Sequence, residues 1–455
     1  MATEILKRKI YDRLLRWKRV SAGKTAALIQ GAPRTGKSLL AEEFAKKEYR
    51  SYIRIDFATV SEELKDMFRY DMEDLDAFFL KLEVLYNIRL HRRESVIILD
   101  EVQWFPQARA MVQYLVKDGR YDYIETGALL AIKESVQGIA LPTDVEHMYL
   151  HPLDFEEFLW AMGHEDVAAP LRECFEKRKP MGPMLHRKAM NMFRLYLIVG
   201  GMPEAVSEYI RSGNLNKVDK VKRNILRFYK DGIRRYGKRG AAKMLAVLEE
   251  LPNQMKHRNQ HFKFATLHQG ARYGEFRESI FWLEEAMVLY GCYTATDPSV
   301  SMETHQDRTV LKIYMADTGL LFSHLYSEKD IEREELYKKI LLANLEDEMG
   351  VLLENAVAQM LTASGHKLFF YTNVDREDRM SRMELDFLLS YDTPEQKNVL
   401  VPVKVKAGKH FKRSALRKFM AKFPEQATVA YDLHTGDLRT EKNIVFLPVY
   451  MAMLL

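Results

Sequence analysis

Cysteine is scarce in this sequence of 455 residues, and long apolar runs are missing. The two cysteines, Cys174 and Cys292, form no Cys-x-x-Cys pair, which excludes a disulfide framework and a paired-cysteine zinc or redox site. No stretch reaches the roughly 18 consecutive apolar residues of a membrane span, and the N-terminus lacks the apolar block of a secretion signal. We therefore expect a cytoplasmic protein with no membrane partner.

An excess of one charge sign is also lacking, since 69 Lys and Arg face 64 Asp and Glu. The net charge of +5 permits contact with nucleic acid without requiring it. Apolar residues make up 47% of the chain and aromatic residues 11%, which excludes intrinsic disorder. At this length we expect a globular protein of two to four domains.

Strand and helix patterns alternate through the first 150 residues or so. Short apolar runs at 25–30, 51–57, 95–99 and 121–125 read as strands, with helical patterns between them. This alternation predicts that residues 1–152 form an α/β domain with a mostly parallel sheet covered on both faces.

The periodicity changes twice more along the chain. The pattern is almost wholly helical from about 153 to 290, and β-like runs at 286–294 and 309–315 predict a hairpin on that helical body. Residues 153–330 are therefore expected to form a helical lid and a winged-helix-like region. Residues 331–455 combine helices and strands again, which predicts a second α/β domain. Their expected strands lie at 368–372, 383–389, 399–405, 427–431 and 444–447.

Gly31 to Ser38 read GAPRTGKS, a complete G-x-x-x-x-G-K-[ST] pattern between a predicted strand and a predicted helix. The glycines let successive backbone N–H groups face a phosphate, while Lys37 reaches the β- and γ-phosphates and Ser38 binds Mg²⁺. The sequence therefore predicts binding of ATP or GTP with magnesium. The predicted nucleotide-binding residues of this loop are Gly31, Arg34, Thr35, Gly36, Lys37, Ser38 and Leu39.

Polar residues end two further predicted strands. Asp100 follows four apolar residues, as expected for the acid that holds magnesium beside Ser38. Glu101 comes next and can orient and deprotonate the attacking water, which favours hydrolysis over mere binding. Thr126 ends another strand and is a candidate sensor of the γ-phosphate. We therefore predict Lys37, Glu101 and Thr126 as the catalytic residues.

The chain resembles bacterial and archaeal AAA-like ATPases related to the signalling ATPases with numerous domains, which carry a C-terminal domain of unknown function. The resemblance implies ATP rather than GTP as the nucleotide and a nucleotide lid in which Gly201 and Pro203 approach the adenine. From the residues alone, Pro203 has only a turn role. The matching motifs are GAPRTGKS (31–38), IILDEVQ (97–103), HPLDFEEFL (151–159), VGGMPEAV (199–206) and YMADTGLL (314–321).

The C-terminal pattern resembles the restriction-endonuclease-like fold. Glu354, Asp386 and Lys406 match three positions of its metal site, but Lys404 stands where a glutamate is expected. Because side chains alternate along a strand, both lysines would face the metal, and a lysine about 4 Å from Mg²⁺ would cost roughly 8 kcal/mol. We therefore predict a degenerate site without metal-dependent cleavage. Rescue of a metal site by Glu384 with Asp386 is an alternative.

Two basic runs leave DNA as a candidate partner. Eight basic residues and no acidic residue lie between Lys404 and Lys422, interleaved with Phe411 and Phe419. A second run from 211 to 239 has eleven basic residues, with Asp219 and Asp231 among them. Solvated helix faces explain such runs equally well. The leading hypothesis is an ATP-driven switch for a protein or DNA partner, and an oligomer is compatible with it. The alternatives are a DNA-processing ATPase with a nuclease and a DNA-binding module with structural nucleotide.

Overall fold

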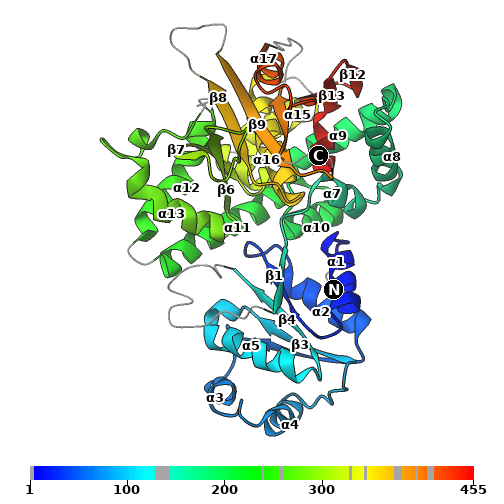
Figure 1. Cartoon of the computed structure of the whole chain (residues 1–455), viewed down its shortest axis with the longest axis vertical. Helices are drawn as coiled ribbons and strands as arrows, with labels where there is room; N and C mark the ends of the chain where they lie inside the picture. The colour runs from blue at the N-terminus through cyan, green and yellow to red at the C-terminus, as the bar shows by residue number, and fades with distance from the viewer. Residues whose placement is uncertain are drawn as a thin grey trace. The chain divides into compact units, whose positions relative to one another are not determined.

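The computed structural model of the chain (Figure 1) describes residues 5–128, 144–237, 240–256, 261–326, 330–342, 346–373, 382–394, 398–406 and 414–455. Its contacts divide the chain into two units. The first unit comprises residues 1–151 with 285–287, and the second comprises 152–284 with 288–455. Among the described residues, no helix is both long enough and apolar enough to cross a bilayer.

The first unit is built on a parallel five-stranded sheet with the order β2-β3-β4-β1-β5. The predicted α/β architecture of this region is thus confirmed. Its strands are β1 (Ala26–Gln30), β2 (Ser51–Asp56), β3 (Ser95–Asp100), β4 (Asp122–Gly127) and β5 (Val145–Tyr149). Its helices are α1 (Ile10–Ser21), α2 (Lys37–Glu48), α3 (Glu62–Tyr70), α4 (Leu75–Tyr86) and α5 (Pro106–Asp118), with a 3₁₀ turn, η1 (Val102–Trp104).

Alternate residues of these strands enter two separate apolar cores. Leu28 and Ile97 pack in one core with residues of α3, α4 and α5, while Ala27 and Ile98 pack in the other with residues of α1 and α2. Burial on both faces explains why these strands read as continuous apolar runs. The arrangement leaves the carboxyl ends of β1, β3 and β4 together at one edge of the sheet, where ligands of such sheets bind.

The second unit begins with helices and ends in a mixed sheet. Its helices are α7 (Phe155–Ala161), α8 (Glu165–Glu176), α9 (Pro183–Val199), α10 (Pro203–Ser212), α11 (Leu215–Tyr236), α12 (Ala241–Lys256), α13 (Tyr273–Glu285), α14 (Thr318–Leu325), α15 (Asp330–Leu341), α16 (Glu346–Ala363) and α17 (Ser414–Lys422). Its strands are β6 (Leu289–Ala295), β7 (Gln306–Met315), β8 (Phe369–Asn373), β9 (Met383–Tyr391), β10 (Val399–Val405), β11 (Ala430–His434), β12 (Arg439–Glu441) and β13 (Ile444–Pro448). Two short 3₁₀ segments, η3 (Phe264–Thr266) and η4 (Val449–Leu454), complete it.

The expected hairpin is present as the antiparallel pair β6 and β7, but it belongs to a larger sheet. β6 also pairs in parallel with β8, so the eight strands run in the order β12-β13-β11-β10-β9-β8-β6-β7. The sequence pattern could not show this pairing, because it joins segments that lie far apart in the chain. The sheet takes two strands from before residue 330 and six from after it. The division of this unit into domains 153–330 and 331–455 stays a prediction.

Candidate functional site

The predicted phosphate loop connects the end of β1 to the start of α2. Gly36 has a φ of 93°, which a residue with a side chain rarely adopts, and it directly precedes the first helical residue. Gly31 leaves no room for a side chain, since a Cβ there would lie 2.4 Å from the carbonyl oxygen of Leu150. The two glycines therefore fulfil the conformational roles that the motif predicts.

Lys37 is buried within this loop. Its Nζ donates hydrogen bonds to the carbonyl oxygens of Gly31 and Ala32, each at 3.0 Å. Burial lowers the pKa of Lys37, and the negative charges of Glu101 and Asp100 act against that shift. Backbone carbonyls thus hold the ammonium group inside the loop. The negative charge of a nucleotide phosphate bound there would pair with its positive charge.

Ser38, Asp100, Thr126 and Glu101 meet at the ends of their elements. Ser38 Oγ donates to Asp100 Oδ1 at 2.7 Å, and Thr126 Oγ1 donates to the same oxygen. The Thr126 hydroxyl also accepts the backbone N–H of Glu101 at 3.2 Å. Thr126 therefore holds the two acidic residues in position through its hydroxyl. β4 can supply this threonine because it lies between β1 and β3 in the sheet.

Glu101 has a left-handed backbone, with φ of 56°, which turns the chain directly after the strand. Gln103 Nε2 donates to Glu101 Oε2, while Gln103 Oε1 accepts the backbone N–H of Ala128 at 3.3 Å. Gln103 therefore orients the carboxylate that is predicted to act on water. Sequence analysis did not identify Gln103, although its place two residues after a candidate base was the available signal.

Arg54 is a second residue of this site that sequence analysis missed. It lies on β2, and its Nε and Nη2 both donate to Asp100 Oδ2, at 2.9 and 2.6 Å. Pairing of neighbouring strands sets this contact, because Arg54 lies opposite Ile98 and two residues before the Asp56–Asp100 pair. No local motif around Arg54 could have indicated it.

The residues present fit a magnesium-bound nucleoside triphosphate. A serine hydroxyl and a carboxylate, 2.7 Å apart, are hard oxygen ligands of the kind that Mg²⁺ prefers. The loop supplies glycines that admit a close phosphate and a buried lysine ammonium. Of the other predicted loop residues, Thr35 is buried and donates to the Ala32 carbonyl oxygen at 2.8 Å, whereas the side chains of Arg34 and Leu39 are exposed.

The last residues of the first unit are bound to the same loop. Leu150 N–H donates to the Gln30 carbonyl oxygen at 2.8 Å, directly before Gly31. Arg8 donates to the carbonyl oxygens of Thr35, at 3.2 Å, and His151, at 2.5 Å. The chain passes into the second unit immediately after His151. The phosphate loop and the exit from its unit therefore share direct contacts.

Three motifs of the resemblance meet inside the second unit. Leu153 N–H donates to the Gly201 carbonyl oxygen at 2.7 Å, and Gly201 N–H donates to Asp317 Oδ2 at 2.6 Å. Tyr196 Oη donates to the Leu153 carbonyl oxygen at 2.7 Å. Asp317 is fully buried, and burial raises its pKa. Pro203 is the first residue of α10, as its predicted turn role requires.

Gly201→Ala should destabilise this network. A Cβ at residue 201 would lie 2.1 Å from the Leu153 carbonyl oxygen, so backbone must shift. We expect a loss of about 2 kcal/mol or more in the free energy of unfolding, measured by urea denaturation. The matched control is Gly232→Ala within α11, where a Cβ meets nothing within 4 Å. That control should be neutral or stabilising, and equal effects of the two variants would contradict the assignment.

A second polar cluster lies in the C-terminal sheet. Lys404 Nζ lies 2.8 Å from Asp386 Oδ1, and Lys406 Nζ lies 2.8 Å from Asp432 Oδ2. Glu354 on α16 accepts a hydrogen bond from Tyr314 Oη at 2.6 Å. The structure thus brings Asp386 and Lys404 together as predicted neighbours, while Lys406 makes its ion pair with a residue of β11.

Lys312 of β7 connects the acids of this cluster, and sequence analysis missed it. Its Nζ lies 3.1 Å from Glu354, 3.8 Å from Glu384 and 3.9 Å from Asp386. Burial acts to lower the pKa of this lysine, but Glu354 and Asp386 raise it above its ordinary value. A protonated ammonium group therefore stands among the carboxylates. Within the described ranges, no group of three His, Cys, Asp or Glu side chains is suited to hold a metal ion.

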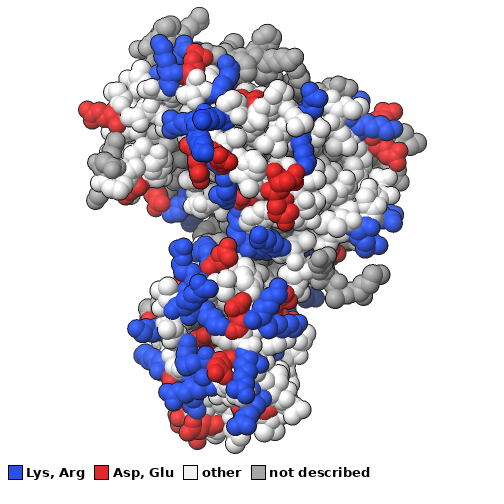
Figure 2. Space-filling view, turned by 90° about the vertical axis from the view of Figure 1, so that its right-hand side faces the viewer, with Lys and Arg blue, Asp and Glu red and all other residues white. Residues whose placement is uncertain are grey.

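Some basic side chains of the two runs form ion pairs with acidic neighbours where the structure describes them. In α11, Arg223 pairs with Asp219 and Arg234 with Asp231, each at 2.7 Å. In the C-terminal run, Phe419 is fully buried and cannot stack on a base, and Phe411 lies outside the described residues. Figure 2 shows basic side chains with acidic ones among them on the face in view. These contacts give DNA binding no specific support.

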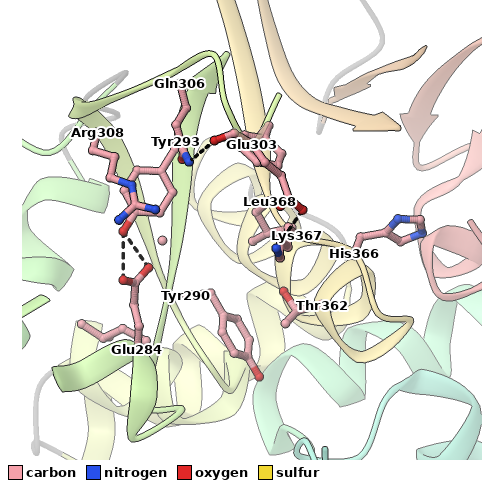
Figure 3. A pocket seen from close by; sticks show the side chains of 13 residues that line it. Glu284, Tyr290, Tyr293, Glu303, Gln306, Arg308, Thr362, His366, Lys367 and Leu368 are labelled. Carbon is pink, nitrogen blue, oxygen red and sulfur yellow. Dashed lines mark hydrogen bonds and ion pairs between the residues drawn. The ribbon is translucent and has the colours of Figure 1, made fainter. Parts of the chain in front are cut away.

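A hollow of about 380 Å³ lies in the second unit beside β6, β7 and the end of α16 (Figure 3). Tyr293 Oη donates to both carboxylate oxygens of Glu284 at 2.9 Å. Lys367 pairs with Glu303 at 2.7 Å, and Gln306 donates to the Glu303 carbonyl oxygen at the same distance. These polar groups satisfy one another, so we assign the hollow no ligand.

Three family models match successive parts of the chain. The model described as AAA domain matches residues 23–159, which include the phosphate loop, Asp100 and Thr126. Two domains of unknown function, DUF8612 and DUF4143, match residues 190–330 and 349–451. The first unit is therefore similar to AAA domains, in agreement with its parallel sheet. No curated protein matches this chain.

Solved structures with partial likeness include PCH-2 of C. elegans, with a TM-score of 0.27 and 12% identity over 48% of this chain and 68% of that one. A STAND protein with a tetratricopeptide repeat sensor from Pyrococcus horikoshii has a TM-score of 0.27 and 10% identity, over 79% of this chain and 48% of its own. Cdc6p from Pyrobaculum aerophilum has a TM-score of 0.26 and 9% identity, over 76% and 97%. Likenesses at these TM-scores support no conclusion about function.

Proposed function

We propose that the first unit binds Mg-ATP and hydrolyses it, and that the nucleotide state controls how the second unit meets a partner. The observation that carries this proposal is the hydrogen-bonded group of Ser38, Asp100 and Thr126 beside the buried Lys37. Similarity of residues 23–159 to AAA domains supports the same chemistry. The preference for ATP over GTP follows from that similarity.

Each residue has a role that its contacts allow. Bound Mg²⁺ would neutralise charge on the phosphate oxygens, with Ser38 and Asp100 as the residues that hold it. Lys37 would exchange its backbone carbonyl partners for phosphate oxygens. Glu101, oriented by Gln103, would orient the attacking water and accept its proton. Thr126 would act by holding Asp100 and the Glu101 backbone.

The exit from the first unit offers a route for control of the second. Leu150 is bound to the residue that precedes the phosphate loop, and Leu153 is bound to Gly201 in the second unit. Only two residues of chain, His151 and Pro152, therefore separate the contact beside the phosphate loop from the motif network, and a displacement of the loop on nucleotide binding would be passed along them. The adenine contact of Pro203 that the resemblance implies stays a prediction.

Phosphate release tests this function and separates its alternatives. Purified protein is assayed with Mg-ATP, with and without duplex DNA, at low and high salt. An ATP-driven switch for a protein partner predicts slow turnover that DNA does not change. Stimulation by DNA that high salt removes would favour the DNA-processing alternative. Salt-sensitive DNA binding without any turnover would favour the module with structural nucleotide.

A protein partner is favoured by the surface of α3 and α4. Tyr70, Leu80 and Val84 are exposed there beside a groove of about 520 Å³. Residues 61–86 contain eight acidic and three basic side chains, in a chain whose net charge is +5. An apolar surface with an acidic surround fits an amphipathic helix that carries basic residues. Such a partner should bind less tightly to Val84→Lys than to the wild type, because the substitution replaces an apolar contact with a charge that repels a basic helix.

We propose that the C-terminal sheet is restriction-endonuclease-like in fold and inactive as a nuclease. Lys312 and Lys404 place positive charge where a cation would bind. At about 4 Å and an effective dielectric near 20, each lysine would oppose Mg²⁺ by roughly 8 kcal/mol before its own ion pairs are counted.

Wild-type protein should therefore cleave no DNA with Mg²⁺ or Mn²⁺. The double variant Lys312→Met with Lys404→Glu should gain a cation site, seen as a higher thermal midpoint in millimolar Mn²⁺. Lys367→Met, which removes an exposed ion pair with Glu303, is the control and should show no gain. Cleavage by the wild type that is lost in Asp386→Ala would contradict the inactive assignment.

A further inference from the structure

Asp100 is shared between two sides of the nucleotide site. Its Oδ1 accepts hydrogen bonds from Ser38 and Thr126, which belong to the proposed catalytic group. Its Oδ2 accepts from Nε and Nη2 of Arg54, which comes from the neighbouring strand. Asp100 is fully buried, and burial of a carboxylate without a positive partner is costly. Arg54 supplies that partner when no metal ion does.

Arg54 has a second acceptor within reach. Its Nη1 lies 3.4 Å from Glu42 Oε2 on α2, a longer contact than either hydrogen bond to Asp100. The Arg54 side chain is 35% exposed, whereas Asp100 is not exposed at all. The guanidinium group therefore has solvent beside it and can shift toward Glu42 without unfolding the strand.

A magnesium ion held by Ser38 and Asp100 would share the Asp100 carboxylate with Arg54, which also carries a positive charge. Two positive charges beside one buried carboxylate repel each other, so each weakens the attraction of the carboxylate for the other. Glu42 also accepts a hydrogen bond from Tyr52 and forms an ion pair with Lys46, so its carboxylate already binds one positively charged side chain besides Arg54.

We propose that Arg54 is the resident counter-ion of Asp100 and that it sets the magnesium concentration at which the nucleotide site fills. Without Mg²⁺, Arg54 neutralises and orients Asp100. When Mg²⁺ binds, the guanidinium moves toward Glu42. Arg54 is thus a positioning residue that acts through Asp100, and the inference rests on the proposed function of the first unit.

The test compares Arg54→Met with the wild type by two readouts. The first is the thermal midpoint as a function of MgCl₂ without nucleotide, and the second is the Mg²⁺ concentration for half-maximal binding of a fluorescent ATP analogue. We expect Mg²⁺ alone to stabilise the variant more than the wild type, and the half-maximal concentration to fall about tenfold. Arg50→Met, which removes an exposed pair with Glu94, should change neither value.

Glu42→Gln provides the opposite prediction and does not depend on Arg54→Met being folded. Loss of the negative charge at residue 42, while the amide oxygen remains as an acceptor, should favour the contact of Arg54 with Asp100 and raise the half-maximal Mg²⁺ concentration about threefold or more. An unchanged or higher magnesium requirement in folded Arg54→Met, or a lower one in Glu42→Gln, would overturn the inference. If wild-type protein bound no nucleotide, the proposed function would fail, while the thermal readout with Mg²⁺ alone would still decide the role of Arg54.

Discussion

Lys37→Ala should weaken binding of Mg-ATP by about 100-fold or more, which corresponds to roughly 2.7 kcal/mol. Lys37 is 4% exposed, and among the described residues its ammonium group donates hydrogen bonds to the backbone carbonyl oxygens of Gly31 and Ala32. Burial lowers the pKa of Lys37 because it removes the water that would stabilise the ammonium charge. A bound phosphate would stabilise that charge in place of water. Fluorescence anisotropy of a labelled ATP analogue measures the change directly.

The matched control for this variant is Lys47→Ala on the same helix. The Lys47 side chain is 62% exposed and pairs with Glu43, so its removal should leave nucleotide affinity unchanged. Both variants should keep the thermal midpoint of the nucleotide-free protein close to that of the wild type. Equal affinities of Lys37→Ala and wild type would show that the loop does not bind the triphosphate as proposed.

Glu101→Gln should retain nucleotide binding and lose turnover by about 100-fold or more. The substitution keeps the shape of the side chain but removes the carboxylate that accepts a proton from water. Affinity should change little, because Lys37, Ser38 and Asp100 remain. Single-turnover phosphate release, with binding measured on the same preparation, separates the two effects.

Gln103→Ala should lower turnover in the same way as Glu101→Gln, but by a smaller factor. It leaves the carboxylate in place but removes the side chain that orients it, so turnover should fall by less than in Glu101→Gln. Glu94→Gln, at an exposed position directly before β3 and thus at the other end of the strand from Glu101, should behave as the wild type. Normal hydrolysis by Glu101→Gln would show that another group serves as the base.

The sequence was sufficient to predict the nucleotide site where its residues are contiguous. The phosphate loop needs consecutive backbone groups, and the acids follow a strand whose apolar run is unmistakable, so Lys37 and Asp100 could be identified from spacing. Arg54 could not, because its contact with Asp100 depends on which strands are neighbours. Gln103 depends on the left-handed turn at Glu101, which no residue type demands.

The C-terminal sheet shows the same limit more strongly. Five of its strands after residue 366 lie within three residues of the predicted bounds, since each is a short apolar run, whereas β12 was not predicted. The addition of β6 and β7 was not foreseen, because it depends on the pairing of Tyr293 with Phe369 across a long stretch of chain. That pairing brings in β7, the strand that carries Lys312. The positive charge within the acidic cluster therefore arises partly from a residue that no C-terminal motif contains.

The most direct test of the account is phosphate release by wild-type protein and Glu101→Gln in the same assay, with ATP and with either Mg²⁺ or EDTA. We expect release by the wild type that requires Mg²⁺, and little release by Glu101→Gln despite bound nucleotide. Equal release by the two proteins, or release that persists in EDTA, would contradict magnesium-dependent hydrolysis at Glu101.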